Sequence, residues 1–486
     1  MRRNYNRDLY KHLEEALEQI SSLKRELEEY RRRTEQELFE CHARISELEV
    51  EGAQKDAIIL KLQTDNERLK RIVNNDSGNS SLPPSSDQKP SRRVNAYNSR
   101  AKTERKVGGQ LGHSGSTLTC EQVTELINSG ACDHSLETYG VPGGSYVTRY
   151  IVDLTIRPVI RELRFFADET GKSTLPAELN SVVTYGNEVK ALGLALMYVG
   201  NVPINRCKAL ISALSKQKLN ISEASLYRFA EEFARRAEPF ISEIKEELLS
   251  AEVLLTDATT VTVDGIQEYI RNQSTDSAVL YTPMRTKTLE EMAQCGVMNL
   301  FAGTYVHDHE TALYHFGTAH AECNAHILRY LKRASEETNN PWCSEMSSLL
   351  LAMNKLKKES PSVIETQFSQ FSKQYDEILK RARVQNSKHS QTFARSEERA
   401  LIARLHKYKE NHLLFALHPK VPFTNNMSER DLRKCKNRQK TSGGFRKQTG
   451  KQIYCTVLSL IETWKRKNLD VFGAIRTGFS HGRVIA

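Results

Sequence analysis

A seven-residue repeat of apolar side chains runs through the N-terminal part of the chain. Stepping by seven from Leu13 reaches Ile20 and Leu27 and continues to position 69, and six of these nine positions are Leu or Ile. A second apolar seam begins at Ala16. Strips at this spacing pair helices with one another, so we expect residues 5–73 to form a coiled coil that drives self-association. The alternative is a solvated single helix with Glu/Lys pairs along its surface.

Length and composition set the broad class. The chain has 486 residues, enough for several domains, and its net charge of +10 favours a polyanionic partner. No apolar run is long enough to cross a membrane, and the N-terminus lacks the apolar core of a signal peptide. The nine cysteines include no Cys-x-x-Cys pair, which argues against a disulfide framework. These features predict a cytosolic protein with no membrane partner.

A turn-rich, polar stretch at residues 74–107 predicts a flexible linker. It contains Ser, Asn, Gly and Pro in place of apolar residues, and its basic run at 92–106 has six Lys or Arg against one acid, Glu104. This run is suited to lie along DNA, and a solvated tether explains it as well.

Residues 108–172 predict a small β-rich module, with strands at 146–156 and 159–166. Candidate zinc ligands in this module are His113, Cys120, Cys132 and His134. Their spacing matches no strong zinc pattern, so zinc binding here is doubtful.

Residues 185–250 are expected to be helical. Ser222 is placed to cap a helix that carries Leu226 and Phe229 inward. A turn followed by a capped helix is typical of the second half of a DNA-binding helix-turn-helix, although an ordinary helical hairpin is the simpler explanation.

From residue 251 the pattern changes to short strands and then to alternating strands and helices. We expect a hairpin turn at 263–266, a helix at 288–294 and a strand at 300–306. The other strands are expected at 253–256, 260–263, 268–272 and 278–281. This order predicts a mixed sheet covered by helices, built from residues 251–342 and 413–486. The charged, helix-like residues 343–412 would form an insertion, and the whole chain is a multidomain α+β protein.

Three acidic residues lie at informative places. Asp257 follows the apolar run 253–256, Asp308 follows the run 300–307, and Glu429 lies near the start of a basic helical stretch. Carboxylates at the ends of buried strands and on a facing helix hold one or two Mg²⁺ ions for in-line phosphoryl transfer. Mn²⁺ is the alternative ion. Taken alone, each acid is more simply explained as an ordinary turn or surface residue with no catalytic role.

The stretch that begins at Glu429 is strongly basic. Nine Lys or Arg lie between residues 430 and 451, against one acid, Asp431. Arg433, Lys436 and Lys440 fall near the helix face of Glu429, which would combine a metal ligand with a phosphate-binding stripe. The candidate DNA-binding residues are Arg430, Arg433, Lys434, Lys436, Arg438, Lys440, Arg446 and Lys447. A solvated basic helix is the alternative.

Several blocks of sequence together resemble the transposases of the insertion sequence sixty-six (IS66) family. They are Thr256-Asp257-Ala258-Thr259, Gly303-Thr304-Tyr305-Val306-His307-Asp308, Cys323-Asn324-Ala325-His326, Asn425-Asn426-Met427-Ser428-Glu429-Arg430 and Ser442-Gly443-Gly444-Phe445-Arg446. The resemblance implies an RNase H-like catalytic core whose DDE triad is Asp257, Asp308 and Glu429. It also implies Mg²⁺-dependent cleavage of transposon ends, joining of their 3′-hydroxyls to target DNA, accessory proteins of the element, and work at the nucleoid.

Two points of the resemblance remain open. Members of the family usually carry a Cys-x-x-Cys-Gly element, and this chain has Cys132-Asp133-His134-Ser135 in its place, without the second cysteine. Cys323 and His326 are one helical turn apart, so they either belong to a metal site near the acids or support the core without binding Mg²⁺. A catalytically silent DNA-binding protein on the same fold, and a Mg²⁺ nuclease that cuts without joining, are the rival functions.

Overall fold

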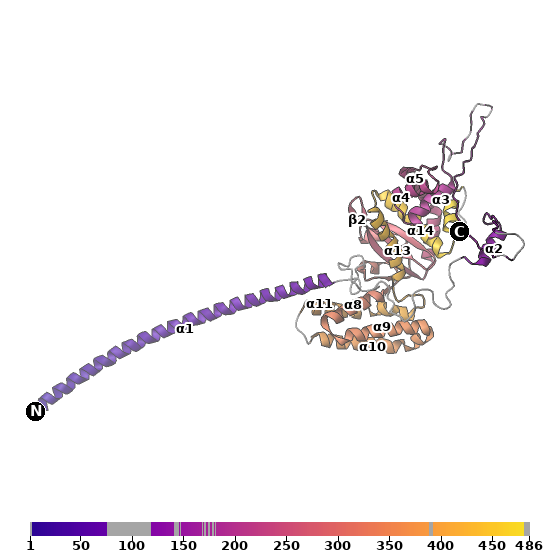
Figure 1. The fold of residues 1–486 in the computed structure, drawn as a ribbon. Helices are drawn as coiled ribbons and strands as arrows, with labels where there is room; N and C mark the ends of the chain where they lie inside the picture. Colours follow the sequence, from indigo (N-terminus) through magenta and orange to yellow (C-terminus); the bar gives the residue numbers. More distant parts are fainter. Residues whose placement is uncertain are drawn as a thin grey trace. The chain divides into compact units, whose positions relative to one another are not determined.

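The computed structural model describes residues 2–74, 118–139, 147–167 and, apart from 388–391, residues 181–480, together with a few single positions between 145 and 179 (Figure 1). The chain divides into two compact units. One comprises residues 1–87, 330–345 and 377–404, and the other comprises residues 88–329, 346–376 and 405–486. Each unit is described by itself.

The N-terminal helix α1 spans Arg2–Asn74 without a break, and Figure 1 shows it as one long, gently curved helix. Its repeating apolar residues are exposed: Leu13 is 57% exposed and Leu27 is 53% exposed. Near its end, Arg71 Nη1 forms an ion pair with Glu397 at 2.6 Å and Arg71 Nε another with Glu337 at 3.5 Å. The apolar strip is therefore present on a helix, and the described chain does not bury it.

The β-rich module expected at 108–172 is not seen among its described residues. These form one helix, α2 (Cys120–Asn128), which Thr119 and Gln122 cap reciprocally, and no strand. The expected strands were wrong: residues 147–166 form no strand, and their apolar side chains are exposed within the described structure, with Leu154 87% exposed and Ile160 93% exposed. Alternation alone does not make a strand when no surface covers its apolar side.

Residues 187–249 form a series of helices in the second unit. Ser222 caps one of them, α5, by accepting a hydrogen bond from the Ser225 N–H, and Leu226 and Phe229 are buried, so the expected cap and inward face are confirmed. The helices are α3 (Asn187–Leu194), the π-helix η3 (Ala195–Val199), α4 (Ile204–Leu214), α5 (Glu223–Arg236) and α6 (Glu238–Leu249). Their buried apolar residues belong to the same core as the sheet.

The sheet has five strands in the order β3-β2-β1-β4-β5. The strands are β1 (Val253–Val263), β2 (Ile266–Ser274), β3 (Val279–Met284), β4 (Thr304–His307) and β5 (Ala319–Glu322). The β1–β2 and β2–β3 pairs are antiparallel, and β4 and β5 run parallel to β1. The hairpin turn at 263–266 is confirmed, with Asp264 and Gly265 both at positive φ. The mixed sheet is confirmed as well.

Two details of the expected strands were wrong. The segments 253–256 and 260–263 are one continuous strand, β1, so Asp257 lies inside a strand and does not end it. The strand expected at 300–306 begins only at Thr304, since Leu300 is 71% exposed and precedes a turn at Gly303.

Helices cover both edges of the sheet. At the β3 edge, the backbone N–H groups of Val279 and Tyr281 donate to the hydroxyls of Thr463 (3.1 Å) and Ser459 (2.8 Å) on α14 (Gln448–Arg466). At the β5 edge, α12 (Lys409–Leu417) places Asn411 to donate to the carbonyl of His320 at 2.9 Å. These contacts satisfy backbone groups that an open edge would leave unpaired.

The remaining elements of the described chain are helices. They are α7 (Leu289–Ala293), the 3-10 helix η4 (Thr311–His315), α8 (Asn324–Thr338), α9 (Pro341–Glu359), α10 (Pro361–Ser387), α11 (Phe393–Lys407), α13 (Asn426–Ser442) and α15 (Val471–Gly478). Thr288 caps α7 through the Glu291 N–H, as expected of a helix at 288–294. Helix α13 packs against β1 and β2.

Candidate active site

Three of the site residues lie side by side at the ends of parallel strand pairings. The register pairs Leu255 of β1 with Val306 of β4, and His307 of β4 with Glu322 of β5. Continuing this register places Asp257 opposite Asp308. Cys323 lies one step past Glu322, beside Asp308. Side chains that follow parallel strands meet at the same edge, which is why residues far apart in sequence come together here.

The segment before α13 is bound directly to these strand ends. The Asn425 backbone N–H donates to the Cys323 sulfur at 3.1 Å, and its side-chain amide donates to the Thr256 carbonyl at 2.9 Å. The Asn324 N–H donates to the carbonyl of Phe423 at 3.1 Å. These bonds fix where α13 begins, so that Glu429, in its first turn, faces the strand ends.

Four potential metal ligands converge at this point. The ligand atoms of Asp308, Cys323, His326 and Glu429 all lie within 4.8 Å of one another. His326 Nδ1 is 2.9 Å from Asp308 Oδ1. Glu429 Oε1 is buried and accepts no hydrogen bond from the described part of the chain. A buried carboxylate oxygen without a donor is an acceptor suited to a cation.

Asp257 lies next to this group, and the negative charges of Asp308 and Glu429 affect its pKa. Burial, followed by the negative charge of Asp308, raises the pKa of Asp257 to about 7. The charge of Glu429 acts in the same direction, while a hydrogen bond from the Ala258 N–H (2.6 Å) and the charge of Arg271 oppose it. The structure thus brings all three predicted acids within electrostatic reach, and their mutual repulsion is what a divalent cation relieves.

Arg271 is fully buried beside Asp257 and has its own carboxylate partner. Its Nη2 donates to both oxygens of Glu310, at 2.9 and 2.8 Å, and its Nη1 lies 3.4 Å from the Thr256 hydroxyl. Lys287 adds a second cation to Glu310 at 3.0 Å. The Arg271 charge therefore offsets part of the negative charge around Asp257, while its hydrogen bonds go to Glu310.

Cys323 and His326 lie in this cluster, beside Asp308 and Glu429. Burial opposes charge on His326, but hydrogen bonds to Asp308 and Cys323 outweigh it and raise the pKa of His326 to about 11. In the absence of a metal ion this imidazole is a cation at neutral pH, held between a carboxylate and a sulfur.

A second group of polar side chains lies behind Asp308. The Glu322 side chain is fully buried and accepts from Tyr314 (2.5 Å), His309 (2.6 Å) and His412 (3.1 Å). Because this carboxylate is buried, it depends on these hydrogen bonds. Sequence reasoning missed this group, since its members are scattered over four elements; the only signal was the density of histidines between positions 307 and 326.

Helix α13 is held on the sheet by Asp431, which sequence reasoning treated only as a neutralising charge. Asp431 Oδ2 accepts from Ser274 (2.9 Å), Asn272 (3.3 Å) and Arg466 of α14 (2.5 Å). Asn272 also accepts from the Asp257 N–H at 3.1 Å and from the Ser428 hydroxyl at 2.6 Å. One buried polar network therefore links β1, β2, α13 and α14 around the site.

The Ser-Gly-Gly-Phe-Arg block at 442–446 ends α13, and its backbone is hydrogen-bonded to the β1–β2 hairpin. Phe445 N–H donates to the Thr262 carbonyl, and Asp264 N–H donates to the Phe445 carbonyl, both at 2.8 Å. Gly443 and Gly444 have φ of 73° and 107°, and a Cβ on Gly444 would lie 2.6 Å from the Thr262 oxygen. The close approach to the hairpin requires glycine at position 444, whereas Gly443, where a Cβ would meet nothing within 4 Å, supplies the left-handed conformation that ends α13.

The eight candidate DNA-binding residues divide into two groups. Three are engaged within the chain: Lys434 forms an ion pair with Glu462, Lys436 donates to the Thr260 carbonyl (2.7 Å) and hydroxyl (2.6 Å), and Arg438 lies over the rings of Tyr198 and Tyr454. The other five are exposed and form no ion pair with the described residues: Arg430, Arg433, Lys440, Arg446 and Lys447.

The candidate zinc ligands of the N-terminal region do not form a comparable cluster within the described residues. Cys120, Cys132 and His134 are exposed, and within the described residues they join no group of three potential metal ligands. His113 lies outside the described residues.

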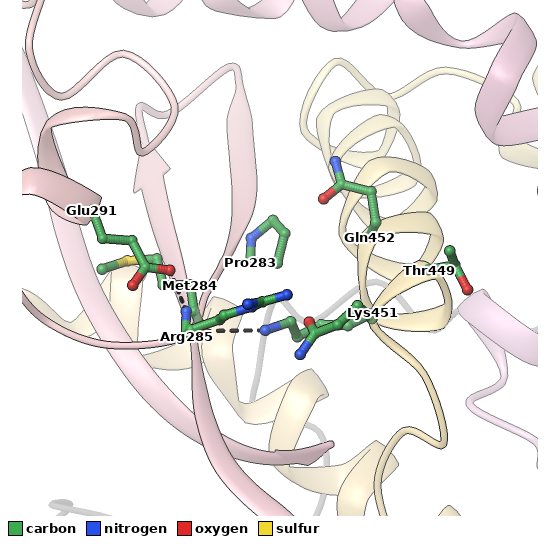
Figure 2. A pocket seen from close by; sticks show the side chains of 8 residues that line it. Pro283, Met284, Arg285, Glu291, Thr449, Lys451 and Gln452 are labelled. Atoms are coloured by element: carbon green, nitrogen blue, oxygen red, sulfur yellow. Dashed lines mark hydrogen bonds between the residues drawn. The ribbon is translucent and has the colours of Figure 1, made fainter. Parts of the chain in front are cut away.

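A cavity of about 330 Å³ lies between the end of β3 and the first turns of α14. Figure 2 shows Arg285, Glu291 and Lys451 around it, and the lining includes none of the three acids. Lys451 is buried and bound to Glu268 and to the Met284 carbonyl, so its charge is already matched.

Comparison with known families agrees with this geometry. The sequence profile of the family described as "Transposase IS66 family" matches residues 183–453, more than half of the chain. The chain belongs to the IS66 family of transposases. A search of curated proteins finds no match. The resemblance stated from the motifs is thereby confirmed, and it makes this chain a member of a family of DNA-processing enzymes that act in transposition. The matched range contains Asp257, Asp308 and Glu429.

No helix in the described part of this transposase is long and apolar enough to span a membrane.

Proposed function

We propose that this IS66 transposase cleaves transposon ends and joins their 3′-hydroxyls to target DNA, with Asp257, Asp308 and Glu429 as the catalytic acids. The observation that carries the proposal is the convergence of these acids on one strand-end edge of the mixed sheet, faced by the first turn of α13. In this proposal the sheet and its helices are the RNase H-like core that the family resemblance implies.

The donors at this edge fit a hard divalent cation. Asp257, Asp308 and Glu429 supply carboxylate oxygens from three different elements, and Glu429 Oε1 has no hydrogen-bond donor among the described residues. When bound, Mg²⁺ (or Mn²⁺) activates the attacking hydroxyl and stabilises the leaving oxygen of the phosphodiester. Asp257 and Asp308 are positioned by the sheet, and Glu429 by the Asn425 and Asp431 contacts of α13, so the three carboxylates would hold the cation with little rearrangement.

The experiment is an end-cleavage and strand-transfer assay with labelled transposon-end DNA and Mg²⁺. Asp257→Asn should abolish both steps while DNA binding stays largely intact, because the substitution removes a metal ligand and keeps the side-chain volume. Asp264→Asn, the same change in the exposed turn at the far end of β1, is the matched control and should leave both steps unchanged. Cleavage retained by Asp257→Asn would refute the assignment, and cleavage without joining in the unaltered protein would favour a nuclease.

The DNA contacts are proposed for the exposed cations near Glu429. Arg433 and Lys440 on α13, with Lys447 just beyond it, are free of ion pairs within the described residues and would contact backbone phosphates. Lys436 shares their face but donates to Thr260, so we expect it to support β1 and not DNA.

Replacing Arg433, Lys440 and Lys447 by Gln should weaken binding to many DNA sequences alike. Each lost phosphate contact should reduce the slope of log affinity against log salt by about 1. Lys355→Gln, which removes an exposed charge from α9, serves as the control. An unchanged slope in the triple variant would show that this face does not hold DNA.

We also propose that the chain self-associates through the apolar strip of α1, as two transposon ends require two active sites. The strip is exposed along the helix, and burying it against a second copy would remove apolar surface from water.

A further inference from the structure

The cluster beside the proposed triad contains donors that Mg²⁺ does not need. Cys323 supplies a sulfur and His326 a ring nitrogen, and both lie within 4.8 Å of carboxylate oxygens of Asp308 and Glu429. Magnesium is bound through oxygen, whereas thiolate and imidazole are the donors of Zn²⁺ and Co²⁺. The donor set of this cluster is therefore that of a softer ion.

The geometry fits one such ion. In a tetrahedral Zn²⁺ site, bonds of about 2.0–2.3 Å place the ligand atoms about 3.3–3.8 Å apart. The cluster is already compact enough that small side-chain rotations reach this spacing. Cys323 comes just before α8 and His326 lies in its first turn, three residues later, and their ligand atoms lie within 4.8 Å of one another. Asp308 and Glu429 approach from the other elements.

Two further observations point to a ligand at this place. Glu429 Oε1 is buried without a donor among the described residues, and the Cys323 sulfur is 1% exposed and held in position by the Asn425 N–H. The other buried cysteines, Cys207, Cys295, Cys343, Cys435 and Cys455, belong to no group of three potential ligands in the described part of the chain. Burial of a thiol is thus common in this protein, and among the described cysteines Cys323 is the one that lies within a group of potential metal donors.

We propose that Asp308, Cys323, His326 and Glu429 bind one thiophilic divalent cation of the Zn²⁺ class, with the Cys323 thiolate as a ligand. This site goes beyond the proposed strand transfer and does not depend on it, since it rests on the donor set alone. Asp308 and Glu429 would be common to this ion and to the proposed Mg²⁺ site, so occupation by one ion excludes the full ligand set of the other.

The experiment is a Co²⁺ titration of the full-length, metal-stripped protein, followed by absorption spectroscopy. It uses a Cys41→Ser, Cys120→Ser, Cys132→Ser background, which removes exposed thiols that would bind cobalt on their own. We expect one Co²⁺ per chain and a sulfur-to-cobalt charge-transfer band in the near ultraviolet. Adding Cys323→Ser should abolish the band and weaken Co²⁺ binding at least ~10-fold. Ser can still accept the Asn425 N–H, so the local fold is preserved.

Two controls keep the outcome decisive. Cys435→Ser changes another buried thiol and should leave the band and the affinity unchanged. His326→Gln should keep the thiolate band at saturation and weaken binding at least ~10-fold, and it decides the matter if Cys323→Ser does not fold. A folded background protein that binds no Co²⁺, a band that persists in Cys323→Ser, or an unchanged affinity in His326→Gln would each overturn the proposal. None of these measurements uses DNA, so a negative result would overturn the metal-site proposal without testing the proposed transposase reaction.

Discussion

Replacing Asp257 with Asn should stabilise the metal-free protein at neutral and alkaline pH. Burial and the charge of Asp308 raise the pKa of this carboxyl from 3.8 to about 7 in the folded state. In the unfolded chain the carboxyl ionises near 3.8, so between about pH 4 and pH 7 the unfolded state loses a proton that the folded state keeps. A raised carboxyl pKa therefore lowers stability as the pH rises through this window, and the full penalty remains above about pH 7.

The size of the effect follows from the two pKa values. Each tenfold change in proton affinity is worth ~1.4 kcal/mol, so the difference between 3.8 and about 7 corresponds to ~4 kcal/mol at most. The folded protein relaxes around a buried charge, so the realised penalty is smaller than this limit. We therefore expect Asp257→Asn to raise the free energy of unfolding by ~2 kcal/mol at about pH 8 and by much less at about pH 4.5. The Asn side-chain oxygen can still accept the Ala258 N–H.

The assay is urea unfolding in EDTA, followed by tryptophan fluorescence. The chain has two tryptophans, and Trp464 lies in α14 beside the sheet, so a Trp342→Phe background reports only the unit that contains the site. Asp264→Asn is the control and should change stability by less than ~0.5 kcal/mol at both pH values. Adding Mg²⁺ at about pH 8 should stabilise the unaltered protein more than the variant. Destabilisation by Asp257→Asn at pH 8, or an equal effect at both pH values, would refute the reasoning.

Three further predictions concern the elements that position the site. Gly444→Ala should cost at least ~3 kcal/mol in thermal or urea unfolding, because it combines a positive φ with a close contact to the hairpin backbone, whereas Gly450→Ala, which meets nothing within 4 Å, should be near neutral. Asp431→Ala should cost ~3–5 kcal/mol in the same assay, since it leaves Arg466 without its carboxylate, and a cost below ~1 kcal/mol would show that the network does not hold α13. Deleting residues 5–73 should lower the oligomeric mass in light scattering, and an unchanged mass would mean that the strip of α1 does not join copies.

Local pattern was sufficient to predict the sheet region and the Ser222 cap, but not the extent of the strands. Asp257 was expected at the end of a strand, yet the strand continues through it as β1 because Thr259 to Val263 pair with β2. The short strand β5 (Ala319–Glu322) was missed, since four residues containing His and Glu have no strand pattern of their own. Its existence depends on pairing with β4, and a pairing partner cannot be read from a segment's own residues.

The basic helix shows a similar limit. Helical spacing predicts which cations share a face with Glu429, but it does not show what each cation contacts. Lys434, Lys436 and Arg438 are each matched by a partner far away in sequence: Glu462, Thr260 and the two tyrosine rings. The charge of this segment therefore overstates the number of cations available to DNA, and only tertiary contacts separate those that bind the protein from those that are exposed.

Two asparagines set the distance between Glu429 and the other acids. Asn272 accepts from the Asp257 N–H and from the Ser428 hydroxyl, so one amide touches β1 and the residue before Glu429. Asn425 donates its backbone N–H to Cys323 and its side-chain amide to the Thr256 carbonyl, so a second residue joins the start of α13 to β1 and to the end of β5. Both are fully buried, where a missing partner is costly, and the bonds resist small shifts of the helix. The acids come from distant parts of the sequence, and these neutral side chains hold them in one arrangement without adding charge to the site.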